Sequence, residues 1–434
     1  MIDKLYAHQI DMLRGLQGGA RYLIAEPRTG KTRPAIAFFG CRKVLVLTKL
    51  AGIPGWLSEL DEMGVGGYTV VNYEKLRSKN WDMAEEWDGL ILDECHVLSK
   101  YPKPCLLAPI ISKLIVRGSR LGISATPCAE SYSQLFHQAK ALRMNLWKEC
   151  KNFYAFHRKN GIKNTLFVHG RQQETYKVCR PEILAEFHRE AFVMERQKAV
   201  VDFVEAKNHI IYFEDADLVS LQKQIMSSGI ITVDGKEVIA ETKVAAAQKA
   251  HQISGGTVLR EVSRTLVRDR DGKVKRNKAG EPITRALNES LILSRKKVQL
   301  IREALPGIKL AILTFFKAEI PLIASAWPNG QITSSPDTFQ SDPDMHFIGS
   351  LQKFSRAVDL SAADAIVMYS IPWSAECYIQ GRERLLKRSR KAAASVYFPL
   401  LRGGIDEAIY QRVAVEKVDF HSTSYSSIAN PVGK

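Results

Sequence analysis

The chain has 434 residues, 45% hydrophobic and 25% charged, a composition typical of a soluble globular protein with two or three domains. Its 62 Lys and Arg exceed its 46 Asp and Glu, and the resulting net charge of +16 predicts a polyanionic partner, most commonly nucleic acid. Seven scattered cysteines without a C-x-x-C pair argue against a disulfide framework or zinc module, and without a membrane-spanning run or a signal-peptide pattern we expect a cytoplasmic protein.

The first predicted element is an amphipathic helix over residues 5–13 that carries Gln9. A glutamine amide offers one donor and one acceptor, and the edge of an adenine ring offers the complementary pair. Gln9 is therefore a candidate for adenine selection, and the alternative is a solvated polar position.

Residues 22–39 have the pattern of a phosphate-binding loop, with an apolar strand, a turn and the start of a helix. The turn reads Ala25-Glu26-Pro27-Arg28-Thr29-Gly30-Lys31-Thr32. Its backbone N–H groups, with Arg28, Thr29 and Gly30 in the loop, would surround a β-phosphate. Lys31 would add a mobile cation and the Thr32 hydroxyl would ligate Mg²⁺. Because Ala25 replaces the usual first glycine, a surface turn is the alternative.

Two adjacent carboxylates, Asp93 and Glu94, follow a predicted buried strand over 90–92. The carboxyl ends of strands in open α/β sheets face the crevice where ligands bind. There Asp93 would hold Mg²⁺, and Glu94 would orient or deprotonate the attacking water of a phosphoryl transfer. Either carboxylate alone could instead cap the next helix, but the upstream Lys31 favours the catalytic pair.

Other strands are predicted over 44–48, over 70–74 and over 121–123, the last ending in Ser124-Ala125-Thr126-Pro127. Their alternation with helices predicts one doubly wound α/β domain over residues 1–150.

The ordered set of Gln9, Gly30-Lys31-Thr32, Asp93-Glu94-Cys95-His96 and Ser124-Ala125-Thr126 resembles the first motor lobe of superfamily 2 helicases and translocases. The resemblance implies ATP and Mg²⁺ as cofactors, and it makes Thr48, Tyr73 and Thr314 candidates for nucleic-acid contact. Thr314 ends a predicted strand over 310–314, which is similar to the strand that opens the family's second lobe.

Two later stretches resemble second-lobe motifs of the same family. Residues 355–361 are similar to the motif that links DNA contact to ATP, so the resemblance assigns Ser355 to nucleic acid and Asp359 to the nucleotide. Residues 373–388 are similar to the last motif, with Gln380 and Arg384 in register and Lys387 where arginine is usual. Arg384, Lys387 or the neighbouring Arg388 would then neutralise the γ-phosphate when the lobes close.

The middle of the chain, residues 151–290, is expected to hold a linker, helical protrusions and a basic hairpin. Arg268, Lys273 and Arg276 lie close to Asp271-Gly272, a strong two-residue turn signal. They could bind phosphates or open a fork, and a solvated loop is the alternative. No aromatic residue lies among these charges, so base stacking is not expected there.

Within superfamily 2 the chain resembles the Swi/Snf-type branch, especially compact helicases of tailed phages. The residues that carry this likeness are the Trp373-Ser374 spacing before Gln380, Gly404-Ile405-Asp406-Glu407-Ala408-Ile409 and Gln252-Ile253-Ser254-Gly255-Gly256. The chain departs from the usual Gly-Thr of that branch, because it has Ser124-Ala125-Thr126 instead.

We therefore expect an α/β protein of two RecA-like lobes, each a parallel sheet flanked by helices, with a helical and β-hairpin insertion between them. The expected domains are 1–150, 151–290 and 291–434. The expected function is an ATP-dependent DNA helicase or translocase, a monomer acting on forked, branched or single-stranded DNA in phage replication, recombination or repair, in the host cytoplasm. The alternatives are a duplex translocase that displaces bound proteins and a clamp that no longer hydrolyses ATP. RNA is the less favoured substrate.

Overall fold

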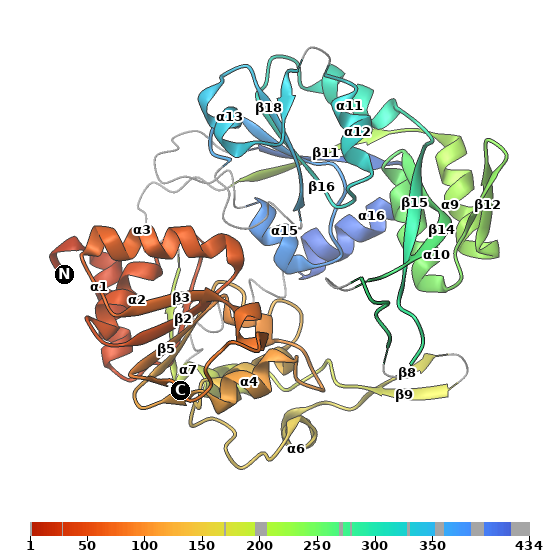
Figure 1. Ribbon diagram of the computed structural model, residues 1–434. Coiled ribbons are helices and arrows are strands. Elements are labelled where there is room, and N and C mark those ends of the chain that lie inside the picture. Colours follow the sequence, from red (N-terminus) through yellow and green to blue (C-terminus); the bar gives the residue numbers. More distant parts are fainter. Residues whose placement is uncertain are drawn as a thin grey trace. The chain divides into compact units, whose positions relative to one another are not determined.

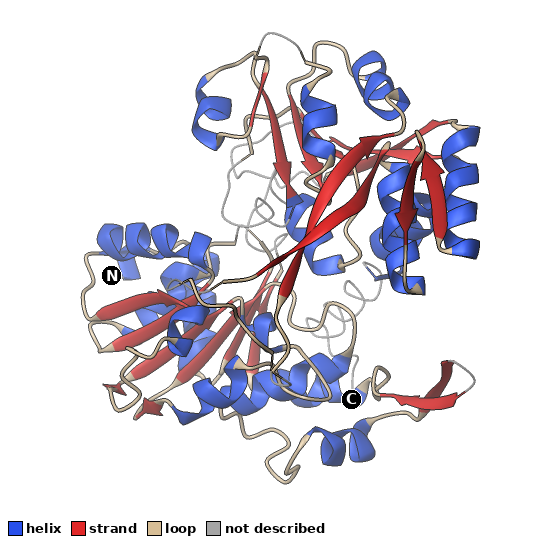
Figure 2. Ribbon diagram, turned by 45° about the vertical axis from the view of Figure 1, so that its right-hand side comes forward, coloured by secondary structure: helices blue, strands red, loops and turns tan. Residues whose placement is uncertain are grey.

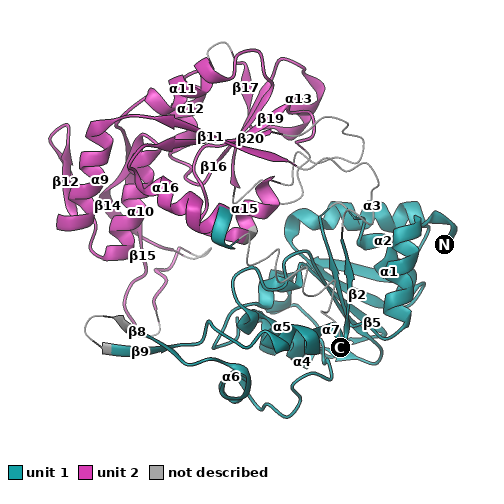
Figure 3. Ribbon diagram, turned by 180° about the vertical axis from the view of Figure 1, so that it is seen from behind, with its two compact units in different colours: residues 1–204, 386–392, 415–434 teal, residues 205–385, 393–414 magenta. Residues whose placement is uncertain are grey.

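Figure 1 shows the computed structural model of the chain. It describes residues 2–27, 29–168, 171–195, 206–268, 272–277, 280–327, 330–351, 360–382 and 395–417. The chain divides into two compact units, coloured separately in Figure 3. Their described parts are residues 2–195 with 415–417, and residues 206–382 with 395–414.

The first unit is built on six parallel strands in the order β10-β1-β7-β5-β2-β3. The strands are β1 (Tyr22–Ala25), β2 (Val44–Thr48), β3 (Tyr68–Asn72), β5 (Gly89–Asp93), β7 (Arg120–Ser124) and β10 (Ala191–Met194). Parallel strands that are buried on both faces need helices on both sides of the sheet, and Figure 2 shows the sheet with helices on either side of it.

Side chains that alternate along each strand divide the core of the first unit into two layers. Leu23 and Val46 face α1 (Ala7–Gln17), α2 (Thr32–Phe39) and α3 (Ile53–Met63). Ile24 and Leu47 face the opposite layer. That layer contains α4 (Leu107–Lys113), α5 (Leu135–Ala141), α6 (Phe153–Asn160) and α7 (Glu182–His188).

Two small pairs of strands lie outside the main sheet of this unit. β4 (Glu86–Trp87) pairs with β6 (Ile115–Val116), and β8 (Asn164–Val168) forms a hairpin with β9 (Arg171–Thr175).

The second unit is a further sheet of six parallel strands, in the order β11-β20-β19-β16-β18-β17. Its strands are β11 (Lys207–Phe213), β16 (Leu310–Thr314), β17 (Ile332–Thr333), β18 (His346–Ser350), β19 (Ala365–Met368) and β20 (Ser395–Leu401). Its helices are α11 (Lys296–Ala304), α12 (Glu319–Ala324), α13 (Pro336–Ser341), α15 (Ala375–Arg382) and α16 (Ile405–Tyr410). The two parallel sheets confirm the expected α/β class with two RecA-like lobes.

The insertion between β11 and β16 shares a small core with the neighbouring strands β11 and β20. It comprises α9 (Ala216–Ser228), β12 (Ile230–Val233), β13 (Lys236–Ile239), α10 (Lys243–Ser254), β14 (Thr257–Leu266) and β15 (Thr284–Ile292). β14 and β15 form the long antiparallel hairpin visible in Figure 2, so the expected β-hairpin is confirmed. Residues 151–290 are shared between the two units, because β10 completes the first sheet while β11 and the insertion belong to the second.

The tip of this hairpin differs in detail from the single turn expected at Asp271-Gly272. Arg268 bridges to Val274, and Arg276 bridges separately to Pro282, so the chain turns twice between β14 and β15. Asp271 itself lies outside the described residues.

Among the described residues, no helix is both long enough and apolar enough to cross a bilayer.

Candidate nucleotide site of the first unit

Three sequence motifs follow three neighbouring strands of the first sheet. The strand order places β7 between β1 and β5, and all three strands run in the same direction. The loop after β1, the carboxylates at the end of β5 and the Ser124-Ala125-Thr126 turn at the end of β7 therefore lie at one edge. This is the edge where parallel α/β sheets bind ligands.

The phosphate loop is held by bonds within itself. The Thr29 hydroxyl donates to the carbonyl of Glu26 at 2.8 Å, and Lys31 Nζ donates back to the carbonyl of Ala25 at 3.1 Å. Gly30 has φ +73°, a left-handed conformation that favours glycine, and α2 begins two residues later at Thr32. The strand, loop and helix predicted from the sequence are confirmed, while Arg28 lies outside the described residues.

Gln9 is buried at the start of α1 and fastens the phosphate loop to that helix. Its Oε1 accepts the N–H of Tyr6 at 2.9 Å, and its Nε2 donates to the carbonyl of Gly30 at 3.0 Å. His8 Nε2 lies 3.0 Å from the carbonyl of Thr29. The Gln9 amide therefore positions the loop in this structure, and its role in adenine selection stays a prediction.

Asp93 ends β5, and side chains from three other segments hold it. The hydroxyl of Thr48 and the indole N–H of Trp56 donate to Asp93 Oδ2 at 2.7 and 2.9 Å. The Tyr73 hydroxyl donates to the Asp93 backbone carbonyl at 2.8 Å. Burial and the adjacent charge of Glu94 raise the pKa of the Asp93 carboxyl above its ordinary value, against the opposing effect of these hydrogen bonds.

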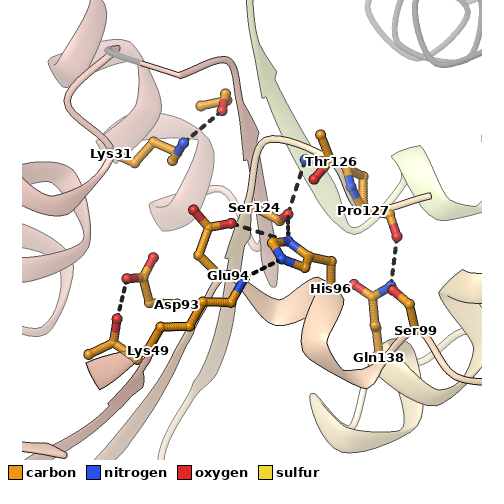
Figure 4. A network of polar contacts seen from close by, with 12 residues as sticks. Lys31, Lys49, Asp93, Glu94, His96, Ser99, Ser124, Thr126, Pro127 and Gln138 are labelled. Carbon is orange, nitrogen blue, oxygen red and sulfur yellow. Dashed lines mark hydrogen bonds and ion pairs between the residues drawn. The ribbon is translucent and has the colours of Figure 1, made fainter. Parts of the chain in front are cut away.

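Glu94 has left-handed backbone angles, φ 54° and ψ 49°, and its side chain contacts His96. Its Oε2 lies 3.1 Å from His96 Nδ1, and His96 Nε2 lies 2.8 Å from the Nζ of Lys49 (Figure 4). Because an ammonium group can only donate, His96 Nε2 accepts and its Nδ1 carries the proton. Burial favours a protonated Glu94, but the contact with His96 and the charges of Lys31 and Lys49 outweigh it and lower the pKa of Glu94 below its ordinary value.

The same histidine connects Glu94 to the end of β7. His96 Nδ1 lies 2.9 Å from the Ser124 hydroxyl, which also accepts the backbone N–H of Thr126 at 3.0 Å. Glu94 and the Ser124-Ala125-Thr126 turn therefore share one network of polar contacts, drawn in Figure 4.

Gln138, from α5, forms hydrogen bonds with residues next to this network. It is fully buried and its Oε1 accepts the Tyr22 hydroxyl at 2.6 Å. Its Nε2 donates to the Ser99 hydroxyl at 2.9 Å and to the carbonyl of Pro127 at 2.7 Å. One amide thus ties β1 to the turns that follow β5 and β7.

Sequence reasoning missed Lys49, Trp56 and Gln138 as parts of this site. Trp56 is 37 residues from Asp93 and Gln138 is 116 residues from Tyr22, and no local spacing pattern marks such partners. Lys49 alone could have been found from the sequence, because it directly follows a buried strand.

The oxygen groups at this edge fit a magnesium ion. Mg²⁺ is held by few protein oxygens together with nucleotide phosphates, and it prefers hydroxyl and carboxylate ligands. Thr32 and Asp93 supply one of each at the predicted positions. Within the described part of the chain, no cluster of three His, Cys, Asp or Glu forms a metal cage.

Several predicted residues of nucleic-acid contact are buried in the structure. Thr48, Tyr73 and Thr314 are each at most 2% exposed. The first two bond to Asp93, and the Thr314 hydroxyl donates to the carbonyl of Phe316 at 3.1 Å. Their contact with nucleic acid stays a prediction.

The predicted second-lobe residues are described only in part. Gln380 is buried in α15. Ser355, Asp359, Arg384, Lys387 and Arg388 lie outside the described residues, so their roles stay predictions.

The basic residues of the hairpin tip are exposed. The Arg268 side chain donates to the carbonyl of Gly272 at 2.8 Å, and that of Arg276 donates to the carbonyl of Gly280 at 2.7 Å. Lys273 lies in the first of these two turns and is also exposed. Each arginine thus closes its own turn, and the charges stay at the surface.

No protein-family model matches the chain, and no curated protein sequence matches it. Among solved structures, the chain is similar to a Sulfolobus solfataricus SWI2/SNF2 ATPase core in complex with dsDNA, with 16% identity and a TM-score of 0.39. The alignment covers 98% of this chain and 94% of that one. At this level of likeness, the proposed function rests on the site and the sequence.

Proposed function

We propose that the protein is an ATP-dependent DNA helicase or translocase of superfamily 2, in which ATP hydrolysis at the first unit drives movement along DNA. One observation carries the proposal: the phosphate loop, the carboxylate pair and the Ser124 turn follow three neighbouring parallel strands and lie at one sheet edge, where His96 contacts both Glu94 and Ser124. An arrangement that serves folding alone does not need two carboxylates beside a lysine-bearing loop.

Each side chain has a chemical task in this proposal. The loop N–H groups and Lys31 bind the phosphates, and Thr32 and Asp93 hold Mg²⁺, which neutralises charge on the β- and γ-phosphates. Glu94 is ionised at neutral pH because the contact with His96 and two nearby lysines lower its pKa, so it accepts a hydrogen bond from the attacking water and orients it. His96 keeps Glu94 in place and connects it to the end of β7.

Residues of the predicted second lobe would complete the motor. Arg384, with Lys387 or Arg388, would supply positive charge to the γ-phosphate, and Asp359 would contact the nucleotide. The net charge of +16 and the exposed arginines and lysine of the hairpin support a nucleic-acid partner. Forked, branched or single-stranded DNA, a monomeric state and a phage setting all belong to this proposal.

The first experiment measures ATP hydrolysis without nucleic acid and with single-stranded DNA, duplex DNA, a four-way junction and RNA, following strand displacement on the same substrates. Stimulation by branched DNA with displaced strands supports a helicase. Stimulation without displacement favours the duplex translocase, and stimulation by RNA alone would contradict the DNA assignment.

Two variants test the site directly. Lys31→Ala should abolish hydrolysis and spare DNA binding, while Glu94→Gln should still bind ATP and lose about 10² to 10⁴ in turnover rate. Lys103→Ala removes an exposed lysine of the same unit and should leave both properties unchanged. Full ATP hydrolysis by Lys31→Ala would refute the assignment of the nucleotide site. If the unaltered protein binds DNA but hydrolyses no ATP, the alternative of a nucleic-acid clamp that no longer hydrolyses ATP is supported.

A further inference from the structure

The two side-chain donors that hold Asp93 converge on a single carboxylate oxygen. Thr48 Oγ1 and Trp56 Nε1 both donate to Oδ2, at 2.7 and 2.9 Å. Among the described residues, Oδ1 accepts no hydrogen bond. In Figure 4, a dashed line meets one carboxylate oxygen of Asp93 and none meets the other. The two oxygens of Asp93 are therefore not equivalent.

Both donors are held rigidly in the first unit. Trp56 is 3% exposed in α3, where it packs in the core between the helices and the sheet, so its ring fixes the direction of its N–H. Thr48 is 1% exposed at the end of β2, which pairs with β5. Tyr73 holds the backbone of Asp93 at the same time. These contacts leave the carboxylate little freedom to rotate.

An oxygen that already accepts two hydrogen bonds has used its in-plane lone pairs, whereas the other oxygen of the same carboxylate still has both. Carboxylates that bind metals are commonly oriented by such hydrogen bonds to the oxygen that does not face the ion.

We propose that Trp56 and Thr48 are positioning residues that turn the Asp93 carboxylate so that Oδ1 faces the Mg²⁺ of bound Mg·ATP. This inference rests on the proposed function, since it concerns the same nucleotide site. It gives Thr48 a role inside the first unit, and it assigns a role to Trp56, a residue with no signal in the local sequence.

The test removes each donor and preserves the packing. Trp56→Phe deletes the N–H, and Thr48→Val replaces the hydroxyl with a methyl group of similar size. Trp147→Phe is the matched control, because Trp147 is also buried in the first unit and its Nε1 donates at 2.6 Å to a different carboxylate, that of Glu186.

The measurement is equilibrium binding of a fluorescent, non-hydrolysable ATP analogue to the full chain as Mg²⁺ is varied, with urea denaturation as a check of folding. We expect each single variant to raise the Mg²⁺ concentration for half-maximal binding several-fold, and the double variant to raise it about 10- to 100-fold. Binding of the analogue without Mg²⁺ should be unchanged. The Trp147→Phe control should match the unaltered protein in its Mg²⁺ requirement.

The possible failures are distinguishable. If the unaltered protein binds no nucleotide in a Mg²⁺-dependent way, the proposed function itself fails. If it does, and Trp56→Phe and Thr48→Val keep its Mg²⁺ requirement, the positioning role is wrong while the nucleotide site stands. If Trp56→Phe does not fold, Thr48→Val alone decides the question.

Discussion

Substitution of Gly30 tests whether nucleotide binding by the phosphate loop depends on the close contact of the loop with α1. In Gly30→Ala, a residue with a Cβ would have to adopt the left-handed backbone conformation of Gly30, φ +73°. That conformation costs about 1–2 kcal/mol for a residue other than glycine. The added Cβ would lie 2.4 Å from Gln9 Nε2, so it would displace the amide that donates to the Gly30 carbonyl. Losing that hydrogen bond costs about 0.5–1.5 kcal/mol more. A total of roughly 1.5–3.5 kcal/mol corresponds to a loss of about 10- to 300-fold in nucleotide affinity.

A double-mutant cycle with Gln9→Ala separates the two costs. Removing the glutamine side chain relieves the clash but not the backbone strain, so Gly30→Ala should cost about 1 kcal/mol less in the Gln9→Ala background. Nucleotide affinity is measured by fluorescence titration, and the free energy of unfolding by urea denaturation.

The matched control for the cycle is Gly64→Ala, which has φ +67° at the end of α3 and open space around the added Cβ. It should lower stability and leave nucleotide affinity unchanged. If the effects of Gln9→Ala and Gly30→Ala simply add, within about 0.5 kcal/mol, Gln9 does not hold the loop.

Three further predictions concern stability and DNA binding. Arg120 is buried and donates to three backbone carbonyls at 2.8–3.1 Å, so Arg120→Ala should lower the free energy of unfolding in urea by about 3 kcal/mol or more. Burial lowers the pKa of His251 to about 3 in the folded protein. Its stabilising contribution is therefore present above pH 6.5 and lost as the pH falls, by about 2 kcal/mol between pH 7 and pH 5, and His251→Phe should remove that loss in urea denaturation at the two pH values. Replacing Arg268 and Arg276 by alanine should weaken DNA binding and lower its salt slope by about 1 for each residue. Arg264→Ala should change both less, because Arg264 already pairs with Glu261 at 2.5 Å. Equal salt slopes for the variants and the unaltered protein in a fluorescence anisotropy titration would favour the alternative, that the hairpin tip is only a solvated loop.

Much of the candidate nucleotide site was predictable because its parts are local. An apolar run followed by Gly30 and Lys31 determines a strand, a turn and a helix within 20 residues. The same holds for the buried strand that ends at Asp93. Such patterns place the candidate residues at the right ends of strands, and the strand order then brings them together.

The partners that fix these residues were not predictable in the same way. Trp56 reaches Asp93 from the next helix along the sheet, and Gln138 reaches three segments from α5. Their roles depend on how helices pack on the sheet, which no sequence spacing records. The second turn of the hairpin was missed for a related reason, because Arg276 closes it with a side-chain bond that is independent of the Asp271-Gly272 signal.

β10 was also missed, since its four residues become a strand only by pairing with β1. This pairing matters to anyone who produces the first unit by itself. A fragment cut at residue 150 would leave β1 as a bare sheet edge and would uncover Tyr22, whose ring packs on Phe187 at 5.3 Å between centroids. Exposed edges of this kind join to one another and aggregate. A soluble fragment should therefore extend through Met194, the last residue of β10.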